Sequence, residues 1–192
     1  MRILPVLFSF FFIIINANAQ SFVYETSDRQ SFKLRPGHHT QFQYVMVNRA
    51  DFKHNSLFDI DENTRHFIIP FSGYYEAEAF FNFNPDTASI KDNRGGINFG
   101  LVHIRDGKQQ YMAAARYTFD KTNQSEYTAV YVLPTIVYLK QGDIIAPAIS
   151  SGYINTHLFY AHIGCPEKTD DCVSFSFKIR LISVEDGNTD FF

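Results

Sequence analysis

The last third of the chain contains the sequence feature that most restricts its fold, a strict alternation of apolar and polar side chains. Residues 173–181 read VSFSFKIRL, and every second position is apolar: Val173, Phe175, Phe177, Ile179 and Leu181. Successive side chains of a β-strand point to opposite faces, so this pattern predicts a strand with one face in a core and the other in solvent. No window shows a convincing 3.6-residue periodicity with helix caps, so we expect an all-β protein.

Further strands are expected along most of the chain. Residues 97–105 and 108–119 flank Asp106-Gly107, which predicts a tight hairpin because both residues tolerate positive φ. Residues 126–139 are apolar on both faces and predict a central strand covered on both sides, in which Pro134 needs a bulge or an edge position. Nine or ten short strands separated by turn residues indicate one antiparallel sandwich or barrel.

The first nineteen residues have the pattern of a secretory signal peptide. A positive start precedes an apolar run at residues 3–15, and Ala17-Asn18-Ala19 fits the small-residue cleavage pattern. We expect residues 1–19 to be removed rather than kept as an anchor, which makes the product secreted and extracellular. The rest divides into a short N-terminal arm at residues 20–30, one domain at 31–184 and a C-terminal tail at 185–192.

Composition excludes one class of partner and suggests another. The formal net charge is −3 and the charges are scattered without a basic stripe, which argues against nucleic acid. The chain has 21 Phe and 11 Tyr, with only four of the Phe in the predicted signal peptide. So many aromatic side chains are hard to hide in one sandwich core.

Residues 73–81, GYYEAEAFF, contain aromatic residues on both faces of one predicted strand. The core face would hold Tyr75, Ala77, Ala79 and Phe81. On the other face, Tyr74 and Phe80 are candidates for a subunit interface, with ordinary partial exposure as the alternative. The glutamates between them, Glu76 and Glu78, fit a solvated flank better than a glycosidase pair.

The two cysteines, Cys165 and Cys172, are expected to form a disulfide in an exported protein, with free thiols or a metal site as the alternatives. Asn123 begins an Asn-Gln-Ser glycosylation sequon, which has meaning only in a eukaryotic source. The sequence has no His-x-His pair, Gly-x-Ser-x-Gly elbow or glycine-rich phosphate loop. We therefore predict no catalytic residue, no cofactor-binding residue and no metal ligand.

Three groups of residues, in order along the chain, resemble motifs of one family. Phe67-x-x-Pro70-x-x-Gly73-x-Tyr75 is similar to the signature of the C1q globular domain, which belongs to the C1q/TNF-like jelly-roll superfamily. Asn48 and Phe58-Asp59 lie upstream where that family has an asparagine and an aromatic-Asp pair. Downstream, the segment from Leu139 to Ile145, which contains Gly142-Asp143, resembles the family's Leu-x-x-Gly-Asp-x-Val. The resemblance spans about residues 31–183.

The resemblance implies a ten-stranded antiparallel jelly-roll sandwich that trimerises and acts by binding. It also implies that calcium can bind near the three-fold axis, although no residue here can be assigned to such a site. The chain departs from the family pattern at Ala77, where an aromatic residue is usual, and at Phe175-Ser176-Phe177 in the last strand. It also lacks a collagen stalk. These departures weaken any close analogy with a particular member.

The leading functional hypothesis is a secreted, non-enzymatic C1q-like recognition module that acts as a homotrimer on an unidentified extracellular protein or glycan. The alternatives are a TNF-like signalling ligand, a structural or matrix trimer, and a jelly-roll enzyme acting on glycans. The sequence names no ligand.

Overall fold

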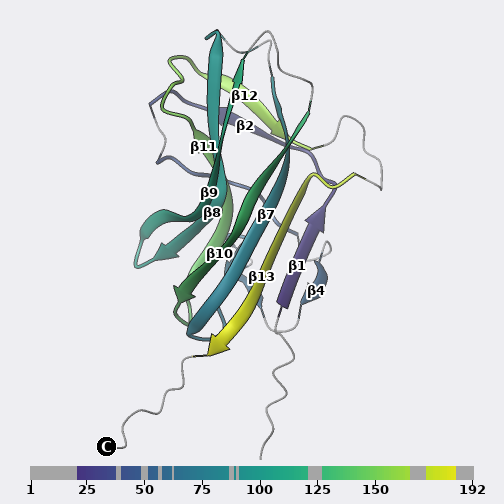
Figure 1. Ribbon diagram of the computed structural model, residues 1–192, viewed down its shortest axis with the longest axis vertical. Helices are drawn as coiled ribbons and strands as arrows, with labels where there is room; N and C mark the ends of the chain where they lie inside the picture. The colour runs from purple at the N-terminus through teal and green to yellow at the C-terminus, as the bar shows by residue number, and fades with distance from the viewer. Residues whose placement is uncertain are drawn as a thin grey trace, which may run out of the picture.

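The structure is a computed structural model, and it describes residues 21–37, 40–48, 52–55, 58–61, 63–86, 89, 91–120, 127–164 and 172–184. Figure 1 shows two β-sheets stacked face to face, with the long strands running along the length of the molecule. Every strand pair is antiparallel. The described residues form no helix long and apolar enough to cross a membrane.

Two sheets account for all the strands of the described residues. Sheet A contains β2 (Gln30–Leu34), β12 (Phe159–Ile163), β7 (Gly73–Pro85), β13 (Phe175–Val184), β1 (Ser21–Thr26) and β4 (Phe52–Asn55) in that order, with β10 (Thr128–Leu139) also paired to β7. Sheet B contains β5 (Asp59–Asp61), β6 (His66–Ile68), β11 (Ile144–Ser151), β8 (Arg94–Arg105) and β9 (Lys108–Asp120) in that order, with β3 (Gln43–Tyr44) paired to β11. The predicted all-β sandwich is confirmed, with thirteen strands in these residues where about ten were expected.

The alternation in the last strand has the predicted consequence. Phe175, Phe177 and Ile179 of β13 are buried, whereas Lys178 and Arg180 are exposed. β13 lies between β7 and β1 in sheet A, so its apolar side chains face sheet B. The aromatic rings meet across the sandwich: the centroid of Phe67, from sheet B, lies 4.7 Å from that of Phe177 and 4.8 Å from that of Phe22.

The predicted Asp106-Gly107 turn is also present, and the Gly142-Asp143 motif forms a second turn. Asp106 and Gly107 have φ values of 51° and 74° between β8 and β9, as a tight hairpin requires. Gly142 has a φ of 84° at the turn between β10 and β11, and its N–H donates to the Ile69 carbonyl at 2.9 Å. This bond ties the turn to the segment that precedes β7.

Three segments differ from the sequence-based expectation. The predicted N-terminal arm, residues 20–30, contains β1, whose Phe22 and Tyr24 are buried because β1 pairs with β13 and completes the sheet. Residues 40–47 form only the two-residue strand β3, and the side chains they bury most fully are Val45 and Val47. The strand expected at 154–163 begins only at Phe159.

A further prediction that the structure corrects concerns residues 126–139, expected as a central strand covered on both sides. β10 pairs only with β7 and therefore lies at an edge of sheet A, with one apolar face uncovered. The predicted irregularity at Pro134 is present, because the register with β7 shifts between Val132 and Thr135. Proline cannot donate to a strand ladder, which explains both the bulge and the edge position.

Several predictions concern residues outside the described ranges. These are the signal peptide at 1–19, the sequon at Asn123, the cysteine Cys165 and the tail at 185–192. They stay predictions.

Candidate interaction surface

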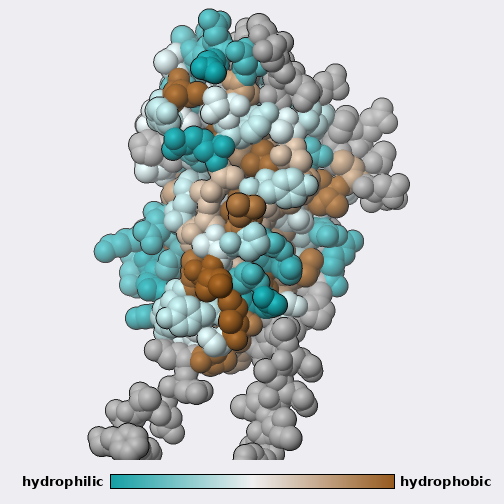
Figure 2. All heavy atoms as spheres, in the orientation of Figure 1, coloured by the Kyte–Doolittle hydropathy of each residue, from teal (hydrophilic) through white to brown (hydrophobic). Residues whose placement is uncertain are grey.

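The outward faces of β7 and β10 form an exposed apolar surface, which we call the apolar face. It consists of Tyr74, Phe80, Tyr131, Leu133, Ile136 and Tyr138. The exposed fraction is 64% for Tyr131, 74% for Leu133 and 63% for Ile136. Figure 2 shows hydrophobic residues gathered over the lower parts of β7, β10 and β13 in this view.

Cross-strand ring pairs organise the apolar face. Tyr74 packs against Tyr138 with ring centroids 5.4 Å apart, and Phe80 packs against Tyr131 with centroids 5.1 Å apart. Both are directly opposed residues in the β7–β10 register. Such pairs stabilise a sheet by about 0.2–1 kcal/mol each. They therefore hold the rings in place but leave much of their surface in solvent.

A hollow of about 380 Å³ opens in the apolar face beside the β10 bulge. Phe80, Tyr131, Leu133 and Pro134 form its apolar side, and Glu78 and Lys178 lie in its wall. The hollow is large enough to take one or two side chains from another protein.

Two ion pairs lie on this sheet face. Arg180 Nη2 lies 2.6 Å from Glu76 Oε2, and Lys178 Nζ lies 3.0 Å from Glu78 Oε1. Each pair joins β13 to β7 across the sheet. The two glutamates are therefore held by cations, an arrangement that fits the solvated flank predicted for them.

The residues of the Phe67 to Tyr75 signature lie at the entry to β7. Phe67 and Tyr75 are fully buried, and a Cβ at Gly73 would collide with the Ser183 carbonyl oxygen. Burial raises the pKa of Tyr75 to about 12, and its hydroxyl donates to the Phe71 carbonyl at 2.7 Å. Pro70 precedes this bend and is half-buried. Phe67, Pro70, Gly73 and Tyr75 therefore shape the bend and fill the core. The apolar face begins beside them, at Tyr74.

Asp143 stabilises the turn formed by the second family motif, Gly142-Asp143. Its carboxylate is buried and accepts hydrogen bonds from Arg105 Nε at 2.6 Å and from the Lys140 N–H at 2.7 Å. Burial by itself would raise the pKa of Asp143, but the hydrogen bonds from Arg105 and Lys140 outweigh it and hold the pKa below its usual value. His103 Nε2 lies 3.0 Å from the same carboxylate. The Gly142-Asp143 turn is thus clamped to the β8–β9 hairpin.

Comparison with known proteins shows the fold. No protein-family model and no curated protein matches this chain. Among solved structures, the Eiger TNF from S. frugiperda superposes with a TM-score of 0.54 at 12% sequence identity. The match covers 90% of this chain and 99% of that one. The chain has a TNF/C1q-like jelly-roll fold. At this identity the likeness establishes the fold alone, and it does not single out the C1q globular domain.

The sequence-predicted interface residues lie on the outward face of this jelly roll. Tyr74 is 52% exposed and Phe80 is half-buried. The larger part of the apolar face comes from β10, where sequence analysis placed no site. The sequence pattern that could have indicated this surface is the second apolar face of residues 126–139. That face was expected to be buried. The outward face of sheet A has no further layer over β10 among the described residues, so Tyr131, Leu133 and Ile136 are exposed.

Of the two cysteines predicted to form a disulfide, the structure describes only Cys172. Cys172 lies at the start of the segment before β13, and Asn82 Nδ2 donates to its Sγ at 3.6 Å. Its proposed disulfide partner, Cys165, lies outside the described residues. Within the described residues, no group of three or more His, Cys, Asp or Glu side chains is placed to hold a metal ion.

Proposed function

We propose that this chain is a secreted, non-enzymatic binding protein that assembles as a homotrimer through the apolar face of β7 and β10. The observation that carries the proposal is the exposure of Tyr131, Leu133 and Ile136 on a strand whose other face is already in the core. Leaving three large apolar side chains in water on one strand forgoes hydrophobic stabilisation that a partner can supply.

The character of the apolar face favours a side-chain contact with a second copy of the chain. β9 lies beside part of the outer edge of β10, and Pro134 and the bulge interrupt the ladder there, which disfavours the addition of another strand to sheet A. The four charges of β7 and β13 on this sheet face already form pairs, which reduces the cost of removing them from water. The TNF/C1q-like fold supports a three-fold arrangement of such copies.

Trimerisation would serve binding by avidity. A ligand that contacts one subunit weakly is held by the other two subunits through effectively intramolecular contacts. This advantage requires a ligand with repeated sites, such as a cell surface or a polymer.

The assembly is tested by sedimentation velocity and light scattering of the secreted protein. The expected mass is three times that of one chain, without dissociation in the micromolar range. A protein that remains a monomer at these concentrations would contradict the proposal.

The second candidate is a TNF-like signalling ligand, which the likeness to Eiger TNF favours. The two functions predict different targets for the fluorescently labelled protein. A signalling ligand shows saturable binding to animal cells that is lost after surface proteolysis. A recognition module instead binds glycan arrays or bacterial surfaces, and proteolysis of the target leaves that binding intact.

An enzymatic function is tested on the same protein. We expect no hydrolysis of a panel of glycans by the wild-type protein or by the variants Glu76→Gln and Glu78→Gln. Hydrolysis that both substitutions abolish would show that the glutamates form a catalytic pair.

A further inference from the structure

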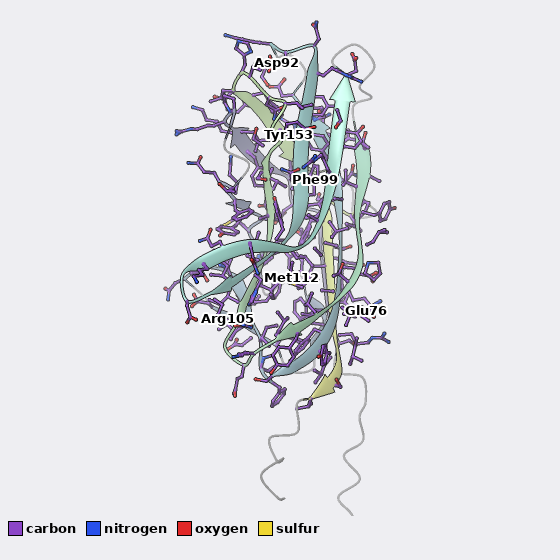
Figure 3. The ribbon with its side chains drawn as sticks, turned by 60° about the vertical axis from the view of Figure 1, so that its left-hand side comes forward. Glu76, Asp92, Phe99, Arg105, Met112 and Tyr153 are labelled. Atoms are coloured by element: carbon purple, nitrogen blue, oxygen red, sulfur yellow. The ribbon has the colours of Figure 1, made fainter. Side chains whose placement is uncertain are left out.

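We propose that the outward face of sheet B binds an acidic sugar chain through its carboxylates. The site is a groove between the β8–β9 ladder, the segment that leads into β3 and the loop after β11. It is formed within one chain, so this inference does not rest on the assembly proposed above. Tyr153 lines this groove, and Figure 3 shows it in the upper part of the molecule, well away from Glu76 at the lower right.

The groove has a volume of about 650 Å³ and is lined chiefly by Phe42, Asn98, Gln109, Tyr111, Arg116 and Tyr153. Its size falls in the range of small-molecule and oligomer sites. The floor of the groove is low because two small residues, Gly100 and Ala114, lie directly opposite each other on β8 and β9. A Cβ at Gly100 would lie 2.7 Å from the Tyr111 ring, so glycine allows that ring to lie against the strand.

Arg116 is held in position by two contacts. Its guanidinium stacks on the Tyr153 ring, 4.9 Å from the centroid, and its Nε donates to Asn98 Oδ1 at 3.3 Å. Asn98 is itself fixed, because its Nδ2 donates to Ser150 Oγ and to the Ser151 carbonyl, both at 3.2 Å. With Nε engaged, the two terminal nitrogens are available for a bidentate bond to a carboxylate.

The loop that carries Tyr153 is anchored at both ends. Asn155 exchanges hydrogen bonds with the Gly96 backbone at 2.7 and 2.8 Å. The Asp92 carboxylate accepts from the N–H groups of Thr156 and His157, both at 3.0 Å. The platform under the arginine is therefore rigid, which limits the entropy lost on binding.

The charge of this region is positive and unpaired. An adjoining hollow of about 580 Å³ shares Thr40, Phe42 and Gln109 with the groove and is lined also by Arg35. Lys33 contributes to its wall too, but the Lys33 ammonium lies over the Tyr160 ring of sheet A, 6.0 Å from the centroid. No Asp or Glu lines either space among the described residues, and Arg116 forms no ion pair within them. The cations thus lie in both parts of one continuous surface and attract an anion with charges in more than one place.

The groups between the cations select a sugar chain over a simple inorganic anion. Besides Asn98, three glutamines whose side-chain amides offer both donors and an acceptor line the two spaces: Gln41, Gln109 and Gln110. A fourth, Gln43, uses its amide to bond the Lys33 backbone. Phe42 and Tyr111, with centroids 4.8 Å apart and rings near perpendicular at 86°, supply flat apolar surface. Alternating hydroxyl partners and apolar surface fit the polar edges and apolar faces of pyranose rings, and arginine fits a planar carboxylate.

The test is a calorimetric titration of the secreted protein with trigalacturonate, a sugar trimer that carries one carboxylate on each ring. We expect saturable binding that weakens as salt is added, and at least a tenfold loss with Arg116→Gln. Arg116→Lys keeps the charge but cannot bind a carboxylate with two parallel hydrogen bonds. We therefore expect the affinity to fall by about threefold to fivefold. Arg94→Gln, an exposed arginine of β8 outside the groove, is the matched control and should bind like wild type.

Two further ligands make the result decisive. The fully methyl-esterified trimer keeps the sugar rings and removes the charges, and it should bind at least tenfold more weakly. Equal binding of the ester, or unchanged binding by the folded Arg116→Gln variant, would overturn the proposal. A sulfated trisaccharide that binds as tightly as trigalacturonate and weakens equally with Arg94→Gln would also overturn it, because the site would then be a general attraction for anions.

Discussion

The two outward faces of this sandwich use aromatic residues in opposite ways. On sheet A, Tyr131 and Phe80 pack on each other and leave a broad apolar surface in solvent. On sheet B, Tyr111 and Tyr153 line a hollow, and partly buried hydrogen bonds hold the Asn98 amide and the Tyr111 hydroxyl beside it. A broad apolar surface with paired charges suits another protein surface, whereas a hollow with unpaired cations suits a small charged ligand. The difference is the basis of our two proposals, assembly through sheet A and ligand binding on sheet B.

The largest expected effect is on assembly. The double variant Leu133→Glu/Ile136→Glu places two charges in the proposed subunit contact, and we expect it to sediment as a monomer because unpaired buried charges are strongly unfavourable. Met46→Glu is the matched control, since Met46 is 51% exposed but lies outside the apolar face, and it should remain a trimer. If the double variant remains a trimer, the subunit contact does not lie on the apolar face.

The two faces of β7 itself should differ strongly in stability. Phe81 is fully buried and packs against Phe99 and Phe175, so Phe81→Ala should lower the free energy of unfolding by about 3–5 kcal/mol. Phe80→Ala, measured by urea unfolding in the monomeric Leu133→Glu/Ile136→Glu protein, should cost no more than about 1 kcal/mol. Equal losses would mean that the apolar face is part of the monomer's own core.

Charged residues should show a similar contrast between the two sheets, with the larger effect at sheet B. Asp143→Asn removes the partner of Arg105 at a buried site and should cost about 2 kcal/mol, since Arg105 is itself partly exposed. The pKa of Asp143 is below its usual value in the folded protein, so the ionised carboxylate stabilises the fold above pH of about 4. That contribution is lost as pH falls through the lowered pKa.

Urea unfolding between pH 3 and pH 7 measures this dependence. Wild type should lose stability toward the acid end more steeply than Asp143→Asn, because the asparagine binds no proton. Parallel curves for the two proteins would contradict the clamp assigned to Asp143.

The smallest effect is expected at the ion pairs of sheet A. Glu76→Gln breaks the pair with Arg180, whose side chain is 46% exposed, and should change the stability of the monomeric variant by less than about 1 kcal/mol. A loss of several kcal/mol in that monomer would show that the pair is a structural element of the fold rather than part of a solvated flank.

The fold could be predicted from the sequence because its signals are local. The two-residue alternation in β13, the Asp106-Gly107 hairpin and the Gly142 turn each depend on adjacent residues, and the motif from Phe67 to Tyr75 gave the superfamily's fold. The sequence did not predict that residues 21–26 form a strand. β1 is short and depends on pairing with β13, which lies more than a hundred residues away in sequence.

The groove on sheet B could not be predicted, and the reason is a single bulge. Counting back from the Asp106-Gly107 turn places Ala115 opposite Asn98, but the register shifts by one residue between Leu101 and Val102. The observed partner of Asn98 is therefore Arg116. One residue of slip moves every following side chain to the other face of a strand. Tyr153 joins this pair only through the fold, since it lies in a loop far along the chain.

The most direct test of this account compares two tyrosines that one chain exposes almost equally. Tyr131 on sheet A is 64% exposed and Tyr153 on sheet B is 66% exposed. Brief iodination of the assembled protein, with the modified sites quantified by mass spectrometry, reports how much of each ring is in contact with solvent. We expect Tyr131 to react at least several-fold more slowly than Tyr153, and to regain an equal rate in the Leu133→Glu/Ile136→Glu variant. Equal rates in the wild-type protein would contradict the claim that a second copy of the chain covers the apolar face.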